Sequence, residues 1–256
     1  MTGPCNPRGV PARDHAATPL RPRLRRRLGI ARSLGVRTVA GMIAASVAFA
    51  WGHVAGSDAQ VTPPPGSLVP DDMDVGGHDL TEWEVAWVKW RLALPRAAAP
   101  SDQECITADQ AGPVWFLDGN GAQPSPATRR CAVPAGSYLM FGPWFICSTV
   151  GPWRVRSADL ARCSRHLWRR NFRGLRVTVD GIRLRPSGHP VVTAPFRFQL
   201  PSGPDMLLAG AARRGRAAVR AKATLLAPLV AGEHRLEVTE RYRGLRRKVT
   251  YNISAA

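Results

Sequence analysis

The sequence predicts a mainly β domain, similar to a β-sandwich or jelly roll, with one tryptophan-rich helix near its start and one arginine-rich helix in mid-chain. Apolar runs of strand length recur through the second half of the chain, and turns rich in Gly and Pro separate them. Two other segments repeat apolar residues at helical spacing. The apolar content of 45% is typical of a globular protein. Residues 79–256 are therefore expected to form a single β-rich domain.

Residues 1–59 are interpreted as a secretory signal with a long basic leader. Seven arginines between Arg21 and Arg37 precede an apolar run over residues 39–51, which is too short to span a bilayer comfortably. Cleavage is expected after Ala59 or after Ala50, because each ends a small-x-small pattern, Ser57-Asp58-Ala59 or Ala48-Phe49-Ala50. An uncleaved anchor is the alternative, and the long leader indicates a twin-arginine route or a start assigned too early. We therefore expect a secreted or cell-surface protein.

The cysteine count gains meaning from export, because disulfides persist only in an oxidising compartment. An even number remains beyond the leader: Cys105, Cys131, Cys147 and Cys163. Four cysteines allow three connectivities, and we favour Cys105–Cys131 with Cys147–Cys163 because each pair brackets one compact stretch. Free buried thiols are the alternative. A zinc site lacks the usual C-x₂-C spacing, so no metal or other cofactor is expected.

Basic residues are 33 arginines against 3 lysines, which indicates codon bias in a GC-rich genome more than selection for charge. Residues 1–59 hold nine arginines and two aspartates, so the rest of the chain has 27 basic and 16 acidic side chains and a net charge near +11. Such a charge attracts nucleic acid, anionic lipid or acidic polymers without choosing among them.

Residues 60–78 have the composition of a flexible, solvated linker, with a run of prolines at its start. The acidic cluster from Asp71 to Asp74 lacks the ligand spacing of a calcium loop.

A helix is expected next, with a capping box formed by Thr81 and Glu84 and an end at Pro95. Its three tryptophans lie at helical spacing on one stripe: Trp83, Trp87 and Trp90. Such a stripe packs onto a sheet more often than it stacks on sugar rings, and we interpret it as core.

Residues 110–144 are predicted to form the central hairpin of the domain. It contains two apolar runs of strand length, one within 112–117 and one within 130–141, separated by a Gly/Pro/Ser loop. Cys105 with Cys131 would clamp the two strands. Trp115 would face away from Val114 and Phe116, so both faces of this sheet are expected to be covered.

Residues 143–173 mix aromatic and basic side chains. Ser157 is placed as the cap of a helix whose Leu160, Cys163 and Leu167 share one face, with the arginines outward. Arginines among aromatics are also typical of an anion-binding platform, here running from Arg154 to Arg176.

From residue 175 onward the chain is expected to be all β. Asp180-Gly181 is a strong type I′ hairpin signal between two apolar runs. Later strands are predicted over residues 191–200, 218–226, 234–242 and 245–253, with a tight turn at 229–234.

Several motifs stand out as a set across residues 80–253. They are tryptophans before Leu-Pro, a Cys, Gln-x-Gly-Pro-Val-Trp-Phe-Leu, Arg-x-Cys-x-Val-Pro-Ala-Gly around 130–136, Val-Asp-Gly, and Pro-Leu-x-x-Gly-x-His at 228–234. This set resembles a group of exported bacterial proteins of actinobacterial type whose function is unassigned. The resemblance implies a secreted β-rich domain and no particular activity. The chain departs from that group at residues 142–147, where such proteins continue with Pro and a polar stretch containing Asn.

No local signature of catalysis occurs, neither Gly-x-Ser-x-Gly nor His-Glu-x-x-His. We therefore lean towards a non-enzymatic binding or structural module at the cell envelope, with a wall polysaccharide or an anionic polymer as its partner and nucleic acid disfavoured. One alternative is a secreted hydrolase with a site near Asp118 and Gln110; the other is the anion-binding surface described above. The candidate ligand-binding residues are Gln110, Asp118, Asn120, Arg130 and His234. The ligand and the oligomeric state do not follow from the sequence.

Overall fold

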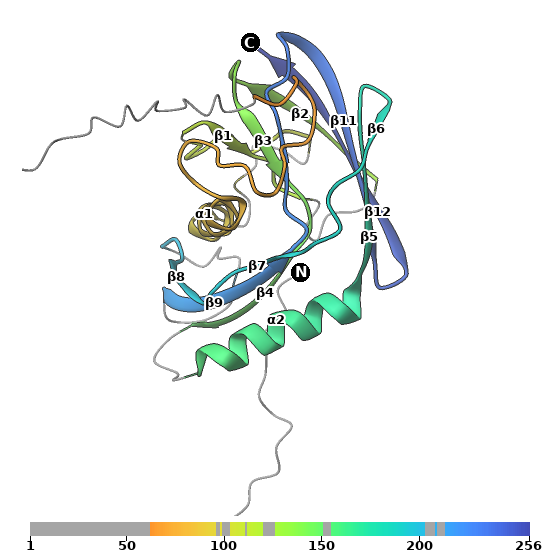
Figure 1. Ribbon diagram of the computed structural model, residues 1–256. Coiled ribbons are helices and arrows are strands. Elements are labelled where there is room, and N and C mark those ends of the chain that lie inside the picture. The colour runs from red at the N-terminus through yellow and green to blue at the C-terminus, as the bar shows by residue number, and fades with distance from the viewer. Residues whose placement is uncertain are drawn as a thin grey trace, which may run out of the picture. The chain divides into compact units, whose positions relative to one another are not determined.

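A computed structural model of the chain describes residues 62–95, 98, 103–110, 112–119, 126–150, 155–202, 208 and 213–256. Within these ranges the chain forms 12 strands in three sheets and two α-helices (Figure 1). The predicted mainly β fold is confirmed, and the arrangement of the sheets is consistent with a sandwich. The expected signal at residues 1–59 lies outside the described residues.

The largest sheet has five strands in the order β2-β12-β11-β5-β6. Their bounds are β2 Ala127–Val133, β12 Leu245–Ala255, β11 Gly232–Tyr242, β5 Phe172–Val179 and β6 Ile182–Leu184. β2 runs parallel to β12, and the other pairs are antiparallel. The predicted hairpin turn is confirmed between β5 and β6, where Asp180 and Gly181 have φ values of 50° and 81°.

The other two sheets are joined by two short links, at each of which the chain leaves a strand of one sheet and enters a strand of the other. One contains β1 (Val114–Phe116), β3 (Tyr138–Phe141) and β10 (Thr224–Leu226); the other contains β4 (Trp144–Val150), β9 (Arg214–Ala221), β7 (Val191–Val192) and β8 (Phe196–Gln199). The chain passes from β3 to β4 through Gly142 and Pro143, and from β9 to β10 through Lys222 and Ala223. Gly142 has a φ of 135°, and a Cβ there would collide with the backbone oxygen of Lys222. Glycine is therefore required where both strands change sheet.

These elements form layers. The inner face of the five-stranded sheet packs against one face of the β1-β3-β10 sheet, and Leu139, Phe141 and Leu226 meet Val177 and Leu236 there. Helix α1 (Leu80–Ala93) covers the opposite face. Both faces of the β1-β3-β10 sheet are thus covered, as expected.

The predicted hairpin over residues 110–144 is wrong. β1 pairs with β3 in parallel, whereas β2 pairs with β12 in another sheet. The disulfide Cys105–Cys131, which is confirmed, ties the segment before β1 to β2 without pairing the two strands. The backbone hydrogen bonds of both strands are satisfied by segments distant in sequence, which local patterning does not reveal.

The capping box of helix α1 lies two residues earlier than predicted. The backbone N–H of Glu82 donates to Oδ1 of Asp79 at 2.7 Å, and the N–H of Asp79 donates to Oε2 of Glu82 at 3.1 Å. Asp79, and not Thr81, is therefore the N-cap. The three tryptophans of the stripe are buried in the core, and Nε1 of Trp83 donates to the Val75 carbonyl oxygen at 2.9 Å. The core interpretation of the stripe is confirmed.

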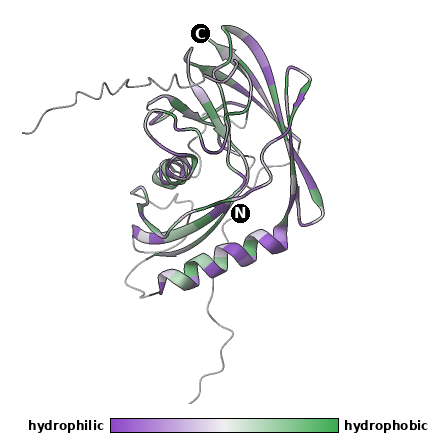
Figure 2. Ribbon diagram, in the orientation of Figure 1, coloured by the Kyte–Doolittle hydropathy of each residue, from purple (hydrophilic) through white to green (hydrophobic). Residues whose placement is uncertain are grey.

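Helix α2 (Ser157–Asn171) covers the outer face of β4 and β9, where Leu160 packs against Cys147 and Ala218. The disulfide Cys147–Cys163 is confirmed and fastens the helix to β4. Ser157 is the first helical residue and does not cap it, because the N-cap position falls on Arg156. The ribbon of α2 carries both hydrophilic and apolar segments, as an amphipathic helix should (Figure 2).

The segment before α1 differs from the solvated linker expected over residues 60–78. Val69 and Val75 are buried in the core, and the N–H of Val69 donates to the Leu225 carbonyl oxygen at 2.9 Å. Leu68 also forms an isolated bridge with Leu226. From residue 62 onward the segment therefore packs as part of the domain.

Candidate functional site

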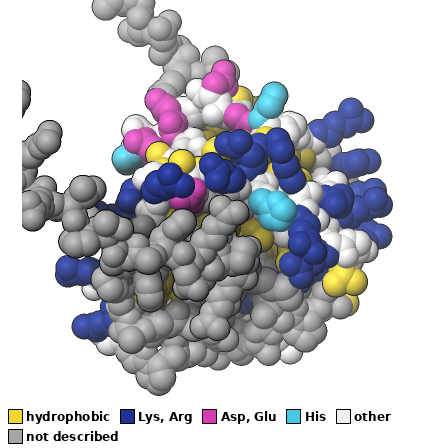
Figure 3. All heavy atoms as spheres, turned by 90° about the horizontal axis from the view of Figure 1, so that it is seen from below, with side chains coloured by type: hydrophobic (Ala, Val, Ile, Leu, Met, Phe, Trp, Pro, Cys, Tyr) yellow, Lys and Arg dark blue, Asp and Glu magenta, His cyan; other side chains and the backbone are white. Residues whose placement is uncertain are grey.

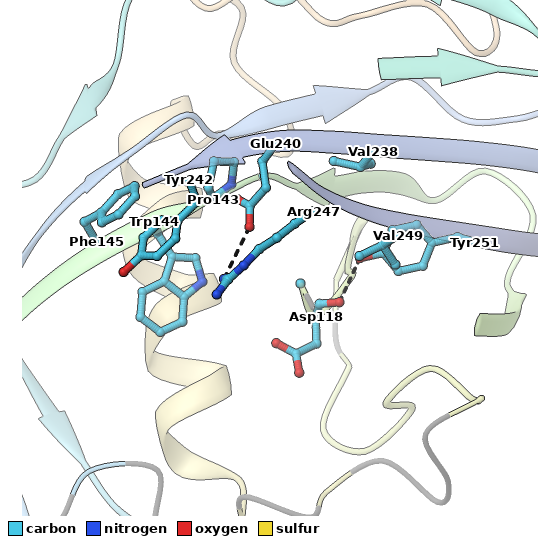
Figure 4. A pocket seen from close by; sticks show the side chains of 12 residues that line it. Asp118, Pro143, Trp144, Phe145, Val238, Glu240, Tyr242, Arg247, Val249 and Tyr251 are labelled. Carbon is cyan, nitrogen blue, oxygen red and sulfur yellow. Dashed lines mark hydrogen bonds and ion pairs between the residues drawn. The ribbon is translucent and has the colours of Figure 1, made fainter. Parts of the chain in front are cut away.

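A cavity of about 100 Å³ opens between the inner face of β11 and β12, the start of β4 and the segment after β1 (Figure 4). Its polar and aromatic lining is formed chiefly by Asp118, Trp144, Glu240, Tyr242, Arg247 and Tyr251. Pockets for drug-sized ligands usually measure about 300–1,000 Å³. This cavity therefore suits a small group or one end of a larger molecule.

Strand β11 supplies the acidic side of the cavity. Alternation along the strand directs Val238, Glu240 and Tyr242 to the same inner face. Glu240 lies directly opposite Arg247 of β12 in the sheet register, and their side chains form an ion pair at 3.6 Å. Burial raises the pKa of Glu240, and the neighbouring Arg247 guanidinium partly opposes that rise.

Aromatic rings form a second wall. Tyr242 stacks on Phe145 of β4, with ring centroids 5.9 Å apart and an interplanar angle of 13°. The guanidinium carbon of Arg247 lies 4.5 Å from the centroid of the Tyr242 ring, which is a cation–π distance. Arg247 is therefore held by a carboxylate and a ring at once, and Figure 4 shows its side chain directed into the cavity.

Asp118 lines the cavity from the segment that follows β1. Its Oδ2 lies 3.1 Å from Nε of Arg91, in the last turn of α1. Burial raises the pKa of Asp118, while the charges of Arg91 and Arg129 lower it.

Tyr251 fixes the backbone of the same segment. Its hydroxyl donates to the carbonyl oxygen of Asp118 at 2.8 Å (Figure 4). Burial raises the pKa of Tyr251, so the phenol remains a neutral donor at physiological pH. The position of Asp118 is thus set by a side-chain ion pair and a backbone hydrogen bond.

Of the described candidate residues, only Asp118 lines the cavity. The Gln110 amide bonds to the backbone: Nε2 donates to the Ile106 and Phe116 carbonyl oxygens, and Oε1 accepts from the Phe116 N–H. Arg130 is exposed on β2 and lies 3.8 Å from Glu104. Gln110 and Arg130 therefore have local structural partners, and Asn120 lies outside the described residues.

His234 stabilises the turn before β11. Its Nδ1 lies 2.7 Å from Oδ2 of Asp180, and its Nε2 lies 2.9 Å from the carbonyl oxygen of Val230. Both partners are hydrogen-bond acceptors, so the geometry favours an imidazole that carries a proton on each ring nitrogen. The hydrogen bond to Asp180 raises the pKa of His234 in agreement with this. Both ring nitrogens of His234 are thus engaged within the turn, and the residue does not line the cavity.

Sequence reasoning missed most of the polar and aromatic cavity residues, among them Glu240, Tyr242, Arg247 and Tyr251. It also missed Arg91, which pairs with Asp118 from outside the lining. One signal was present, because Glu240 occupies an inward position in an alternating strand, where a charged residue requires a partner. Its partner and the contribution of α1 depend on tertiary contacts. In the part of the chain that the structure describes, no group of three or more His, Cys, Asp or Glu side chains could hold a metal ion.

The fold and the cavity define a mainly β domain with two disulfides and a small, charged, aromatic-walled site. No family model and no curated protein matches the chain. The solution structure of amebosin is similar to it at 12% identity with a TM-score of 0.23, over 57% of this chain and 100% of the amebosin chain. Neither of the described helices is long and apolar enough to cross a membrane.

Proposed function

We propose that the protein is an exported, non-enzymatic module that binds a sugar residue of a cell-envelope polysaccharide in the cavity between β4 and β11. The observation that carries this proposal is the placement of Arg247 between Glu240 and the Tyr242 ring. Sugar hydroxyls can donate to the carboxylate and accept from the guanidinium. The apolar face of a sugar ring can pack on the aromatic wall.

The cavity size supports a single residue of a chain as the ligand. About 100 Å³ is below the usual range for a complete drug-sized ligand, so the remainder of the polymer would extend into solvent. Export supports an envelope ligand, because the two disulfides are compatible with a secreted protein and the N-terminus is expected to be a signal.

Binding to purified cell-wall polysaccharide tests the proposal. We expect the protein to be retained, and Glu240→Gln to weaken retention at least tenfold because it removes the charge while preserving the side-chain shape. Glu237→Gln is the matched control: Glu237 lies on the same strand, pairs with Arg235 and Lys248, and faces away from the cavity. Passage of the wild-type protein unretained at low salt, or equal loss in both variants, would count against the proposal.

The second candidate is a secreted hydrolase. It is favoured by one observation, namely that burial raises the pKa of both Asp118 and Glu240 in one cavity. Paired carboxyl groups of this kind serve as acid and nucleophile, or acid and base, in glycoside hydrolysis. We place it second because each carboxylate is paired with an arginine, and because Gln110 and His234 bond elsewhere. Release of soluble sugar from the polysaccharide, abolished by Asp118→Asn and by Glu240→Gln, would establish the hydrolase instead.

A further inference from the structure

A second hollow, of about 200 Å³, lies on the outer face of the five-stranded sheet. Side chains alternate between the two faces of a strand. On β5, Val177 is buried inward while Arg176 is exposed, and on β11, Val238 is buried while Arg241 is exposed. The hollow is thus separated from the first cavity by the thickness of the sheet, and it is built from different side chains.

Five arginines line this hollow: Arg173, Arg176, Arg183, Arg241 and Arg246. They come from three neighbouring strands, β5, β6 and β11, and from β12 at the end of the β11–β12 hairpin. In the space-filling view, Lys and Arg side chains gather on the side of the molecule that carries this sheet (Figure 3). Three strands and a hairpin thus direct positive charge to one place.

The register brings these side chains together. Arg241 lies directly opposite Arg246 on β12 and opposite Gly174 on β5. Side chains of directly opposed residues are about 4.5–5.5 Å apart at Cβ, so the Arg241–Arg246 pair is repulsive. Gly174 leaves space on the β5 side of Arg241, since a Cβ at that position would meet nothing within 4 Å. The floor of the hollow is therefore open to a ligand.

No carboxylate in the described part of the chain forms an ion pair with any of the five arginines, and no acidic residue lines the hollow. The nearby carboxylates are used elsewhere: Glu237 binds Arg235 and Lys248, and Glu240 binds Arg247 on the inner face. Within the described residues, Arg173 is the one member of the five whose side chain forms hydrogen bonds, from Nη1 to the Arg169 and Phe172 carbonyl oxygens. The fold thus retains like charges whose repulsion an anion would relieve.

We infer that this arginine cluster is a binding site for a ligand with two or more phosphate groups. The planar guanidinium presents paired donors that match phosphate oxygens, and five of them exceed what one phosphate group can satisfy. None of the described residues that line the hollow is aromatic, so they provide no stacking surface of the kind on which single-stranded nucleic acid depends. The predicted surface from Arg154 to Arg176 contributes only Arg173 and Arg176 to the site, and Arg154 lies outside the described residues.

The test uses sodium tripolyphosphate as the probe, with the full chain and isothermal titration calorimetry. We expect binding by the wild-type protein and at least a tenfold loss in the double variant Arg241→Gln/Arg246→Gln. The matched control is Arg197→Gln, an exposed arginine of β8 in another sheet. Equal loss in the control would reduce the effect to net charge and overturn the proposal, as would undiminished binding by Arg241→Lys/Arg246→Lys, since lysine keeps the charge without the paired donors.

A thermal melt separates loss of the site from loss of the fold. Because the double variant removes a repulsive pair, its melting temperature is expected to equal or exceed that of the wild type while binding is lost. A lower melting temperature together with lost binding would assign the arginines a structural role and overturn the proposal.

Two further probes identify the source of the phosphate groups. Tripolyphosphate binding with co-sedimentation on vesicles of anionic phospholipid supports a headgroup, and tripolyphosphate binding without co-sedimentation supports a soluble or polymeric phosphate. Retardation of duplex DNA without any tripolyphosphate binding would overturn the site, because the attraction would then follow from the summed field.

Discussion

The Nε atom of Arg91 lies 3.1 Å from Oδ2 of Asp118, and this ion pair joins the last turn of α1 to the segment that leaves β1. Both side chains are largely buried, with exposed fractions of 7% and 19%. The same Asp118 accepts a hydrogen bond from Tyr251 of β12 through its carbonyl oxygen. The cavity is therefore anchored to the helix on one side and to the five-stranded sheet on the other.

Asp118→Asn is expected to lower the free energy of unfolding by about 3–5 kcal/mol, because it removes the carboxylate that neutralises the buried Arg91 charge. Urea denaturation measures the loss. The double variant Arg91→Met/Asp118→Leu is expected to recover much of it, since apolar replacement of a buried pair is often neutral. If the separate losses of Arg91→Met and Asp118→Leu add up to the loss of the double variant, the two residues are not coupled.

A lone carboxyl in the core provides a second stability test. Glu84 of α1 is fully buried, and neither of its carboxylate oxygens has a hydrogen-bond partner in the described structure. Burial raises the pKa of Glu84 well above its usual value. Below the unfolded-state value of about 4.3 the group costs no ionisation energy, and stability falls as pH rises from there through the folded-state pKa.

Glu84→Met is therefore expected to raise the free energy of unfolding by about 1–3 kcal/mol at pH 8, with a smaller gain at pH 4. Urea denaturation at both pH values measures the difference. Lys89→Met, at an exposed position of the same helix, is the control, and its effect should lack this pH trend. An equal gain for Glu84→Met at both pH values would contradict a buried ionisable group.

The pair of Asp180 and His234 predicts a window of maximal turn stability. The folded-state pKa of His234 is raised above the unfolded-state value of about 6.5. The contribution of His234 to stability is therefore complete below about pH 6.5 and is lost as pH rises through its folded-state pKa. The pKa of Asp180 is lowered, although desolvation opposes the hydrogen bonds that lower it, so its contribution is lost only as pH falls below its folded value. The pair therefore contributes most between about pH 4 and 6.5.

His234→Ala should lower the melting temperature more at pH 5.5 than at pH 9. The effect should correspond to less than about 1 kcal/mol, because Asp180 is 44% exposed and exposed pairs contribute little. His166→Ala, exposed on α2, is the control and should show no comparable change. A larger loss at pH 9 would mean that the imidazole is neutral in the fold.

Local signals in the sequence identified the features that depend on neighbouring residues. Asp180-Gly181 specifies its own backbone conformation, the tryptophan stripe specifies one helix face, and each disulfide closes a short stretch. The partners of β1 and β2 could not be found in this way, because β1 pairs with β3 and β2 pairs with the distant β12, both in parallel. The expected hairpin failed for that reason.

The residues of the candidate site are even farther apart in the sequence than the paired strands. Asp118 and Tyr251 are 133 residues apart, and Glu240 meets Arg247 only through the register of β11 and β12. Asp118 could be selected as a loop carboxylate, but its partner Arg91 comes from a helix whose other side chains form the core. An inward-facing Glu240 was the one part of this arrangement that the strand pattern could have indicated.

Gly142 offers a test of the bend between the sheets. Gly142→Ala is expected to cost about 3 kcal/mol or more, because φ is 135° and the new Cβ would collide with the Lys222 backbone. Gly188→Ala is the matched control, since that position has open space and no left-handed backbone conformation. Equal unfolding free energies for the two variants in urea would show that the strands do not bend here as the structure describes.

Ligand binding in the cavity should depend on pH through Glu240. Because burial raises its pKa, the side chain takes up a proton at a higher pH than an exposed glutamate does. A neutral Glu240 no longer holds Arg247 as an ion pair and offers a weaker acceptor to a sugar hydroxyl. Polysaccharide affinity is therefore expected to fall on acidification, with a midpoint above about pH 4.3.

Calorimetric titrations from pH 4 to 8 measure this midpoint. Glu240→Gln should flatten the pH profile of affinity, whereas Glu237→Gln should leave its midpoint unchanged. If the Glu240→Gln profile keeps the wild-type midpoint, another group, with Asp118 first among those lining the cavity, controls binding.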